Sequence, residues 1–157
     1  LIFAGPADKR SYYNAVKRLA FSADITDSVV FAGTVIAELR QLYGLAKVIA
    51  FPSLQENSPL AVLEAMAQGK AIVASDIAPL REMLPAGTAE LVSPLDHEAL
   101  AKALIRLLRD DSAREELGAR ARQRAYDVYR WEKVASRIVE AYERLTRRPA
   151  EPARGVG

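Results

Sequence analysis

The fold is decided by residues 46–76, AKVIAFPSLQENSPLAVLEAMAQGKAIVASD. The runs at 46–53 and 70–76 are short and apolar, which is typical of strands buried on both faces. Between them, residues 58–69 predict a helix with Ser58 as its N-cap, Pro59 at the first helical position and Gly69 beyond the end. A strand, a helix and a second strand in this order predict a right-handed parallel βαβ unit.

The same alternation continues on both sides of this unit. Further strands are predicted at 1–5, 28–33 and 89–94. Further helices are predicted at 11–22, 35–44 (closed by Gly44), 79–84, 96–109 (capped by Asp96), 112–126 and 131–147. The sequence therefore predicts an α/β fold, a Rossmann-like doubly wound parallel sheet closed off by C-terminal helices. We expect one domain over 1–147 and a disordered Pro- and Gly-rich tail over 148–157.

Tyr13, Val16, Leu19 and Ala20 share one face of the helix predicted at 11–22. Tyr129 and Trp131 are expected to anchor the last helix in the core, since large aromatic side chains favour burial.

The composition excludes several classes of site. The chain has 157 residues and a formal net charge of +2, and its basic residues are dispersed among glutamates, so we predict no nucleic-acid partner. The absence of cysteine excludes disulfides, thiolate catalysis and Cys-based zinc sites, and it fits a cytoplasmic location. His97 is the only histidine, and we predict a surface or capping role for it and no metal site.

Polar residues follow the predicted strands, where parallel α/β sheets bind their ligands. We therefore expect functional residues after positions 5, 33, 52, 75 and 94. Glu56 falls in the loop before the helix at 58–69, and Glu64 on its second turn. The first-turn amides of Leu60, Ala61 and Val62 form a potential anion site. A carboxylate on either side of an anion site could bind hydroxyl groups that flank the anion. A ligand made of a sugar, a diphosphate and a ribose has this order of hydroxyl groups and charge.

A plainer interpretation is also open, in which Glu56 is a solvated loop residue and Glu64 a surface position. Against it, Glu64 lies in a helix that is apolar on most sides, so we expect it to be partly buried or turned toward a cleft. Asp76 and Glu82 follow the strand at 70–76, and either a site role or loop and capping duties would suit them.

The same segment resembles the signature of the retaining GT-B glycosyltransferases of the large GT4 family. The matching residues are Pro52-Ser53, the Glu56-x7-Glu64 pair, Glu64-Ala65-Met66-Ala67, Gly69 and Ile72-Val73-Ala74-Ser75. Further matches are VVFAGTV, ELRQLYGLAKVIAFPS, ASDIAPLREML, LVSPLDHEALAKAL and YRWEKVASRIVEAY. The resemblance covers nearly all of residues 1–147, and so many matches in order are highly specific.

The resemblance implies a retaining, metal-independent transferase that uses a UDP-, GDP- or ADP-type sugar as donor and needs no cofactor. It implies that Glu56 contacts the hydroxyls of the transferred hexose and that Glu64 binds the ribose. The backbone around Asn57 and Ser58 would face the sugar, the amides of Leu60 and Ala61 the diphosphate, and the backbone of Val35 after Gly33 the nucleobase. Many members have glycine where this chain has Pro59, which cannot donate a hydrogen bond.

Comparison with the family also predicts parts that this chain lacks. The first βα unit of the donor domain, with its basic pair, and the N-terminal acceptor domain are expected before Leu1. Any peripheral membrane contact would be made through that domain, and the chain alone is expected to be inactive. The alternative function is a non-catalytic module or subunit that binds nucleotide sugars. A phospho-receiver domain is excluded, because LIFAGPADKR (1–10) provides only Asp8 where an acidic cluster is needed.

Overall fold

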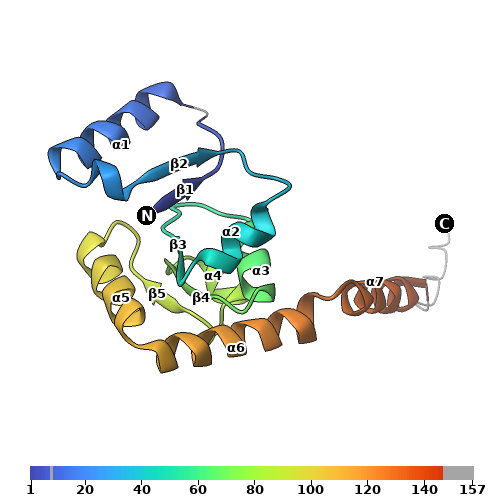
Figure 1. Ribbon diagram of the computed structural model, residues 1–157. Helices are drawn as coiled ribbons and strands as arrows, with labels where there is room; N and C mark the ends of the chain where they lie inside the picture. The colour runs from blue at the N-terminus through green and yellow to red at the C-terminus, as the bar shows by residue number, and fades with distance from the viewer. Residues whose placement is uncertain (8, 147–157) are drawn as a thin grey trace, which may run out of the picture. The chain divides into compact units, whose positions relative to one another are not determined.

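The computed structural model describes residues 1–7 and 9–146 (Figure 1). The described residues form two compact units, one over Leu1–Gly44 and one that begins at Leu45. The strands are β1 (Ile2–Ala4), β2 (Val30–Gly33), β3 (Val48–Phe51), β4 (Ala71–Ser75) and β5 (Glu90–Val92). The α-helices are α1 (Arg10–Ser22), α2 (Leu39–Leu45), α3 (Leu60–Ala67), α4 (Ala78–Met83), α5 (His97–Arg109), α6 (Asp111–Tyr129) and α7 (Trp131–Thr146). A 3₁₀ turn, η1, covers Thr26–Ser28. The α/β class and the strand–helix alternation are confirmed, and the tail at 148–157 lies outside the described residues.

The strands pair as two parallel sheets, β1-β2 and β3-β4-β5, where the sequence predicted one. The β1–β2 sheet belongs to the first unit. Its contact with α1 is an aromatic cluster, in which Phe31 stacks on Phe3 at 5.3 Å and meets Tyr13 edge-on at 5.0 Å between ring centroids. The short strand β1 leaves Phe3 43% exposed, so this sheet has little core of its own. Of the residues that share one predicted face of α1, Leu19 is 68% exposed and Ala20 is buried.

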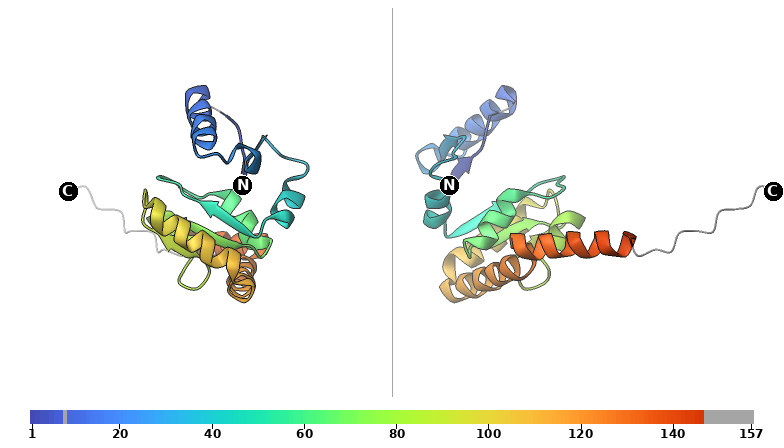
Figure 2. Two further views of the ribbon diagram at one scale, coloured as in Figure 1. Left: turned by 60° about the vertical axis from the view of Figure 1, so that its left-hand side comes forward. Right: turned by 90° about the vertical axis from the view of Figure 1, so that its right-hand side faces the viewer.

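The second unit contains the main core. Every residue of β4, the central strand, is buried. Ala71 and Val73 pack with Ala103 and Leu107 of α5 and Leu117 of α6. Since side chains alternate along a strand, Ile72 and Ala74 lie on the opposite face, and both are fully buried. The expectation of a sheet covered on both faces is therefore confirmed for this strand, and Figure 2 shows α5 running along the sheet.

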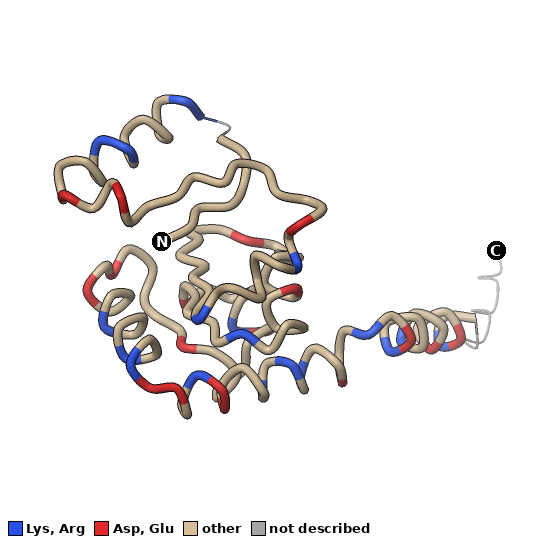
Figure 3. The backbone as a smooth tube through the Cα atoms, in the orientation of Figure 1, with Lys and Arg blue, Asp and Glu red and all other residues tan. Residues whose placement is uncertain are grey.

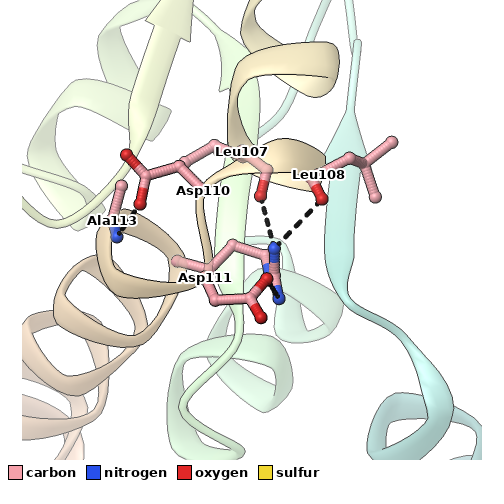
Figure 4. Close-up of polar contacts among 6 residues, drawn as sticks. Leu107, Leu108, Asp110, Asp111 and Ala113 are labelled. Carbon is pink, nitrogen blue, oxygen red and sulfur yellow. Dashed lines mark hydrogen bonds and ion pairs between the residues drawn. The ribbon is translucent and has the colours of Figure 1, made fainter.

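The corner between α5 and α6 is a single residue, Asp110. Its carboxylate accepts a hydrogen bond of 2.9 Å from the amide of Ala113, which caps α6 (Figure 4). The guanidinium of Arg114 donates to the carbonyls of Leu107 and Leu108 at the end of α5, at 2.8 and 3.2 Å. One helix end is thus tied to the start of the next. The predicted cap of α5 is also confirmed, because Asp96 accepts from the amide of Ala99 at 2.8 Å.

Three predicted details of the helices are wrong. The helix expected over 35–44 begins only at Leu39, and Gly44 lies inside it, because a single glycine costs a helix only about 1 kcal/mol. Trp131 is 76% exposed and anchors no core, since α7 has no buried residue over its described length.

The charged residues of the C-terminal helices are distributed as the sequence predicted. Lys, Arg, Asp and Glu are mixed along α5, α6 and α7 (Figure 3).

Candidate donor site

The three-stranded sheet brings its loops together at one edge. Because β3, β4 and β5 are parallel, their carboxyl ends lie side by side. Phe51 pairs with Ala74, and Ser75 pairs with Val92. Asp76 extends the ladder beyond β4, since its amide donates to the carbonyl of Val92 at 2.7 Å. The loops after β3 and β4 therefore begin at neighbouring points, which is where such sheets bind ligands.

The loop after β3 ends at the first turn of α3. Pro59 occupies the N-cap position with φ −71° and ψ 109°, so the helix begins at Leu60 and the prediction of Ser58 as N-cap is wrong. A proline has the same φ inside a helix and just before one, so the sequence did not separate the two positions. The carbonyl of Pro59 accepts from the amides of Val62 at 3.1 Å and Leu63 at 3.4 Å. The prediction that the amide of Val62 points out of the start of the helix is therefore wrong.

The remaining predicted anion-binding residues stand at the start of α3. Leu60 and Ala61 form its first turn, and both are exposed. The positive end of the helix dipole lies there, although α3 is only eight residues long. Asn57 and Ser58, which precede the helix, are also exposed. This arrangement offers backbone N–H groups and polar side chains on one short stretch of chain.

The two glutamates are placed on either side of this turn. Glu56 is half-buried in the loop, whereas Glu64 is exposed one turn into α3. Of the two alternatives predicted for Glu64, partial burial is therefore excluded and an orientation toward a cleft stays a prediction. The buried face of α3 consists only of Val62, Ala65 and Met66. These three residues form a narrow apolar face. Leu60, which is 70% exposed, and Glu64 therefore lie on the solvent-exposed side of the helix.

The far end of α3 is closed by a Schellman turn. The amide of Gly69 donates to the carbonyl of Met66 at 2.9 Å, and that of Lys70 to Ala65 at 3.1 Å. Gly69 has φ +65°, which confirms its predicted position just beyond the helix. Both ends of the helix that carries Glu64 are therefore defined by specific backbone contacts.

Asp76 and Glu82, for which two roles were open, differ in their surroundings. Asp76 is half-buried and forms an ion pair with Arg81 of α4 at 2.5 Å. Arg81 was not among the predicted site residues, although its spacing of five residues from Asp76 across a strand-to-helix turn was a usable signal. Glu82 is exposed, and its carbonyl accepts from Arg124 of α6 at 3.2 Å. His97 is exposed at the first position of α5, as predicted for a surface role.

Gly33 and Val35, the predicted nucleobase contacts, belong to the first unit. Gly33 ends β2 with φ +66°, and its carbonyl accepts from the amide of Gly5 at 2.8 Å. An L side chain is strained at this φ, which favours glycine here. Val35 is half-buried in the segment between β2 and α2. The structure thus groups Glu56 to Glu64 in one unit and Gly33 with Val35 in the other.

Other features of the described residues lie apart from these positions. Two open pockets of about 590 and 270 Å³ lie where α3 and its C-terminal turn meet α6. Neither Glu56 nor Glu64 lines either pocket. Over 1–7 and 9–146, no group of three or more His, Cys, Asp and Glu residues could hold a metal ion. In the same ranges, no helix is long and apolar enough to cross a membrane.

Comparison with known proteins gives consistent results. Residues 1–110 match the family model described as glycosyl transferases group 1. The chain is 44% identical to an MMP α-(1→4)-mannosyltransferase of Mycolicibacterium hassiacum over 72% of its length, and it spans 28% of that relative. It resembles sucrose-phosphate synthase from Thermosynechococcus elongatus, with a TM-score of 0.82, 30% identity, and coverage of 93% of this chain and 38% of that one.

A further solved structure shares the fold at lower identity. It is Anabaena HepE in complex with UDP-glucose, with a TM-score of 0.83 and 21% identity. The similarity covers 90% of this chain and 40% of the HepE chain. The chain therefore spans well under half the length of each of these proteins.

Proposed function

Because this chain belongs to the family of glycosyl transferases group 1, with a GT-B type α/β fold, we propose that it is the donor-binding half of a retaining glycosyltransferase. The reaction transfers a hexose from a nucleotide-diphosphate sugar to an acceptor. One observation carries the proposal. The start of α3 lies at the carboxyl edge of a parallel sheet, with Glu56 in the loop before it and Glu64 exposed one turn later.

The diphosphate binds at the start of α3 in this proposal. The amides of Leu60 and Ala61 and the helix dipole stabilise the negative charge, which increases as the diphosphate departs. Val62 takes no part, because its amide already bonds to the carbonyl of Pro59. Electrostatic stabilisation of this kind supports a metal-independent reaction.

The glutamates have different roles. Glu64 accepts hydrogen bonds from the ribose hydroxyls, and its exposure on α3 leaves it accessible to a ligand. Glu56 orients the transferred sugar together with the backbone at Asn57 and Ser58. The backbone of Gly33 and Val35 contacts the nucleobase. Hydrogen bonds to charged groups contribute about 1.5–3 kcal/mol each, so two well-placed carboxylates would account for much of the donor's affinity.

The acceptor binds to a separate domain in this proposal, which agrees with the greater length of the relatives. A cytoplasmic location is proposed on the absence of cysteine from the sequence.

A thermal-shift panel tests the proposal directly. The chain is heated with UDP-glucose, GDP-mannose or ADP-glucose, and with the same sugars lacking a nucleotide. A ligand that binds only the native state raises the melting temperature by mass action. We expect one nucleotide sugar to raise it and the free sugars to leave it unchanged. No shift with any of the nucleotide sugars at millimolar concentration would contradict the proposed function.

A further inference from the structure

Asp76 stands at the same sheet edge as the loop that carries Glu56. It follows the last residue of β4, and β4 pairs with β3 so that Phe51 lies opposite Ala74. The pairing ends there, so Asp76 and the start of the Glu56 loop leave the sheet at the same edge. The backbone of Asp76 is fixed there by the 2.7 Å hydrogen bond from its amide to Val92. The position of Asp76 is therefore set by the sheet itself.

The orientation of its carboxylate is set by Arg81. The Nε atom of Arg81 donates to Oδ1 of Asp76 at 2.5 Å, and Nη2 donates to the carbonyl of Asp76 at 3.2 Å. The two side chains are 44% and 58% exposed, and an ion pair this exposed adds little stability. Its main effect is geometric, because the guanidinium is held by the backbone carbonyl of Asp76 while its Nε atom bonds Oδ1 of the same residue.

The second carboxylate oxygen, Oδ2, has no hydrogen-bond partner among residues 1–7 and 9–146. A charged acceptor at a ligand-binding edge would ordinarily repel a diphosphate. Here the guanidinium balances its charge, so the pair can accept hydrogen bonds from hydroxyl groups without opposing an anion nearby. The backbone of Asp76 is thus fixed by the sheet, its carboxylate is held by Arg81, and the Asp76–Arg81 pair carries no net charge.

We propose that Asp76 is a specificity residue that accepts a hydrogen bond from a hydroxyl of the transferred sugar through Oδ2, and that Arg81 is its positioning residue. This inference rests on the proposed function and deepens it, since it assigns a second carboxylate to the sugar. It predicts a contact with the sugar alone, and none with the nucleotide. Asp76 should therefore affect the affinity for a nucleotide sugar more than the affinity for the matching nucleotide diphosphate.

Isothermal titration of the chain tests this difference, with UDP-glucose against UDP and GDP-mannose against GDP. The variants are Asp76→Asn and Arg81→Gln, and the control is Glu98→Gln, which breaks an exposed ion pair with Lys102 on α5. We expect Asp76→Asn to weaken nucleotide-sugar binding about tenfold, the effect of losing one hydrogen bond to a charged acceptor. Binding of the bare diphosphate and all binding by Glu98→Gln should stay unchanged. Arg81→Gln should reproduce the sugar-specific loss at smaller size.

Three results would overturn the inference. Equal losses for nucleotide sugar and diphosphate would show a structural role for Asp76. Equal losses for nucleotide sugar and diphosphate in Arg81→Gln, with Asp76→Asn unchanged, would make the arginine a phosphate ligand. Unchanged binding in both variants would remove the pair from the site while leaving the proposed function intact. If the unaltered chain binds neither ligand of either pair, the proposed function fails and the inference fails with it.

Discussion

Gly118 of α6 lies directly against the backbone of Gly69. A Cβ atom placed on Gly118 would be only 2.1 Å from the carbonyl oxygen of Gly69 and 2.9 Å from its carbonyl carbon. Those atoms belong to the turn that ends α3, so two glycines determine how closely α6 approaches the helix that carries Glu64. A backbone atom cannot move aside as a flexible side chain would, so this contact admits no larger residue.

The first prediction is that Gly118→Ala destabilises the protein by about 1–3 kcal/mol, because overpacking outweighs the better helix propensity of alanine. Urea unfolding measures the effect as a lower midpoint at constant slope. Gly44→Ala is the matched control, since Gly44 also lies in a helix but has nothing within 4 Å of an added Cβ. That control should be neutral or slightly stabilising. Equal midpoints for the two variants would contradict the close contact.

The second prediction is that Glu64→Ala weakens binding of a nucleotide diphosphate. The change removes a carboxylate that the ribose hydroxyls would otherwise bond, and a loss of about tenfold or more is expected. Calorimetry with UDP, GDP and ADP measures it, with Glu98→Ala as a control on an exposed helix position. Because Glu64 is itself exposed, its removal should leave the unfolding midpoint nearly unchanged. Identical affinities in Glu64→Ala and the parent would rule out the ribose role.

The third prediction concerns turnover. In an active glycosyltransferase that contains this chain, Glu56→Gln should lower kcat strongly, by roughly 100-fold, which is typical when an electrostatic contact to the reacting group is lost. Steady-state kinetics separate this effect from a rise in KM for the donor. Near-normal kcat would sink the assignment of Glu56 to the transferred sugar.

The fourth prediction is that EDTA leaves the activity of that enzyme largely intact. In the proposed reaction, helix-terminal amides at Leu60 and Ala61 stabilise the leaving diphosphate, a task that other enzymes give to a bound metal ion. Initial rates with and without excess chelator provide the test, and added Mg²⁺ provides the control. Strict dependence on Mg²⁺ would count against this class of mechanism.

The fifth prediction concerns Trp131, the only tryptophan of the chain. Since its side chain is 76% exposed, its fluorescence should be quenched efficiently by acrylamide in the folded protein. Trp131→Ala should change the free energy of unfolding by no more than about 0.5 kcal/mol, as for other surface positions. A loss of about 2 kcal/mol would instead indicate a packed indole.

The sequence predicted the order of elements well, because local signals are strong where propensity and tertiary packing agree. Asp96 and Gly69 are examples, since a cap and a left-handed turn depend on nearby backbone alone. The errors occurred where distant contacts decide. The sequence of α3 is apolar nearly all round, so it could not show that only one narrow face is buried or that Glu64 is exposed. The exposure of Trp131 likewise depends on packing that periodicity does not report.

The candidate site was predictable in part for a similar reason. Glu56 and Glu64 were identified by their spacing around a helix start, a local relationship that the structure retains. The pairing of Asp76 with Arg81 spans a strand end and a separate helix, and its geometry became visible only in the structure. Whether these positions bind a donor stays a prediction until ligands are measured.

The corner at Asp110 has a consequence for how the chain can vary in length. One residue ends α5 and caps α6, so no spare residue connects the two helices. An insertion or deletion there would rotate α6 by about 100° relative to its present face, since each residue advances a helix by that angle. Gly118 would then no longer meet Gly69. Natural and engineered variants of this protein should therefore tolerate changes of length poorly at this corner.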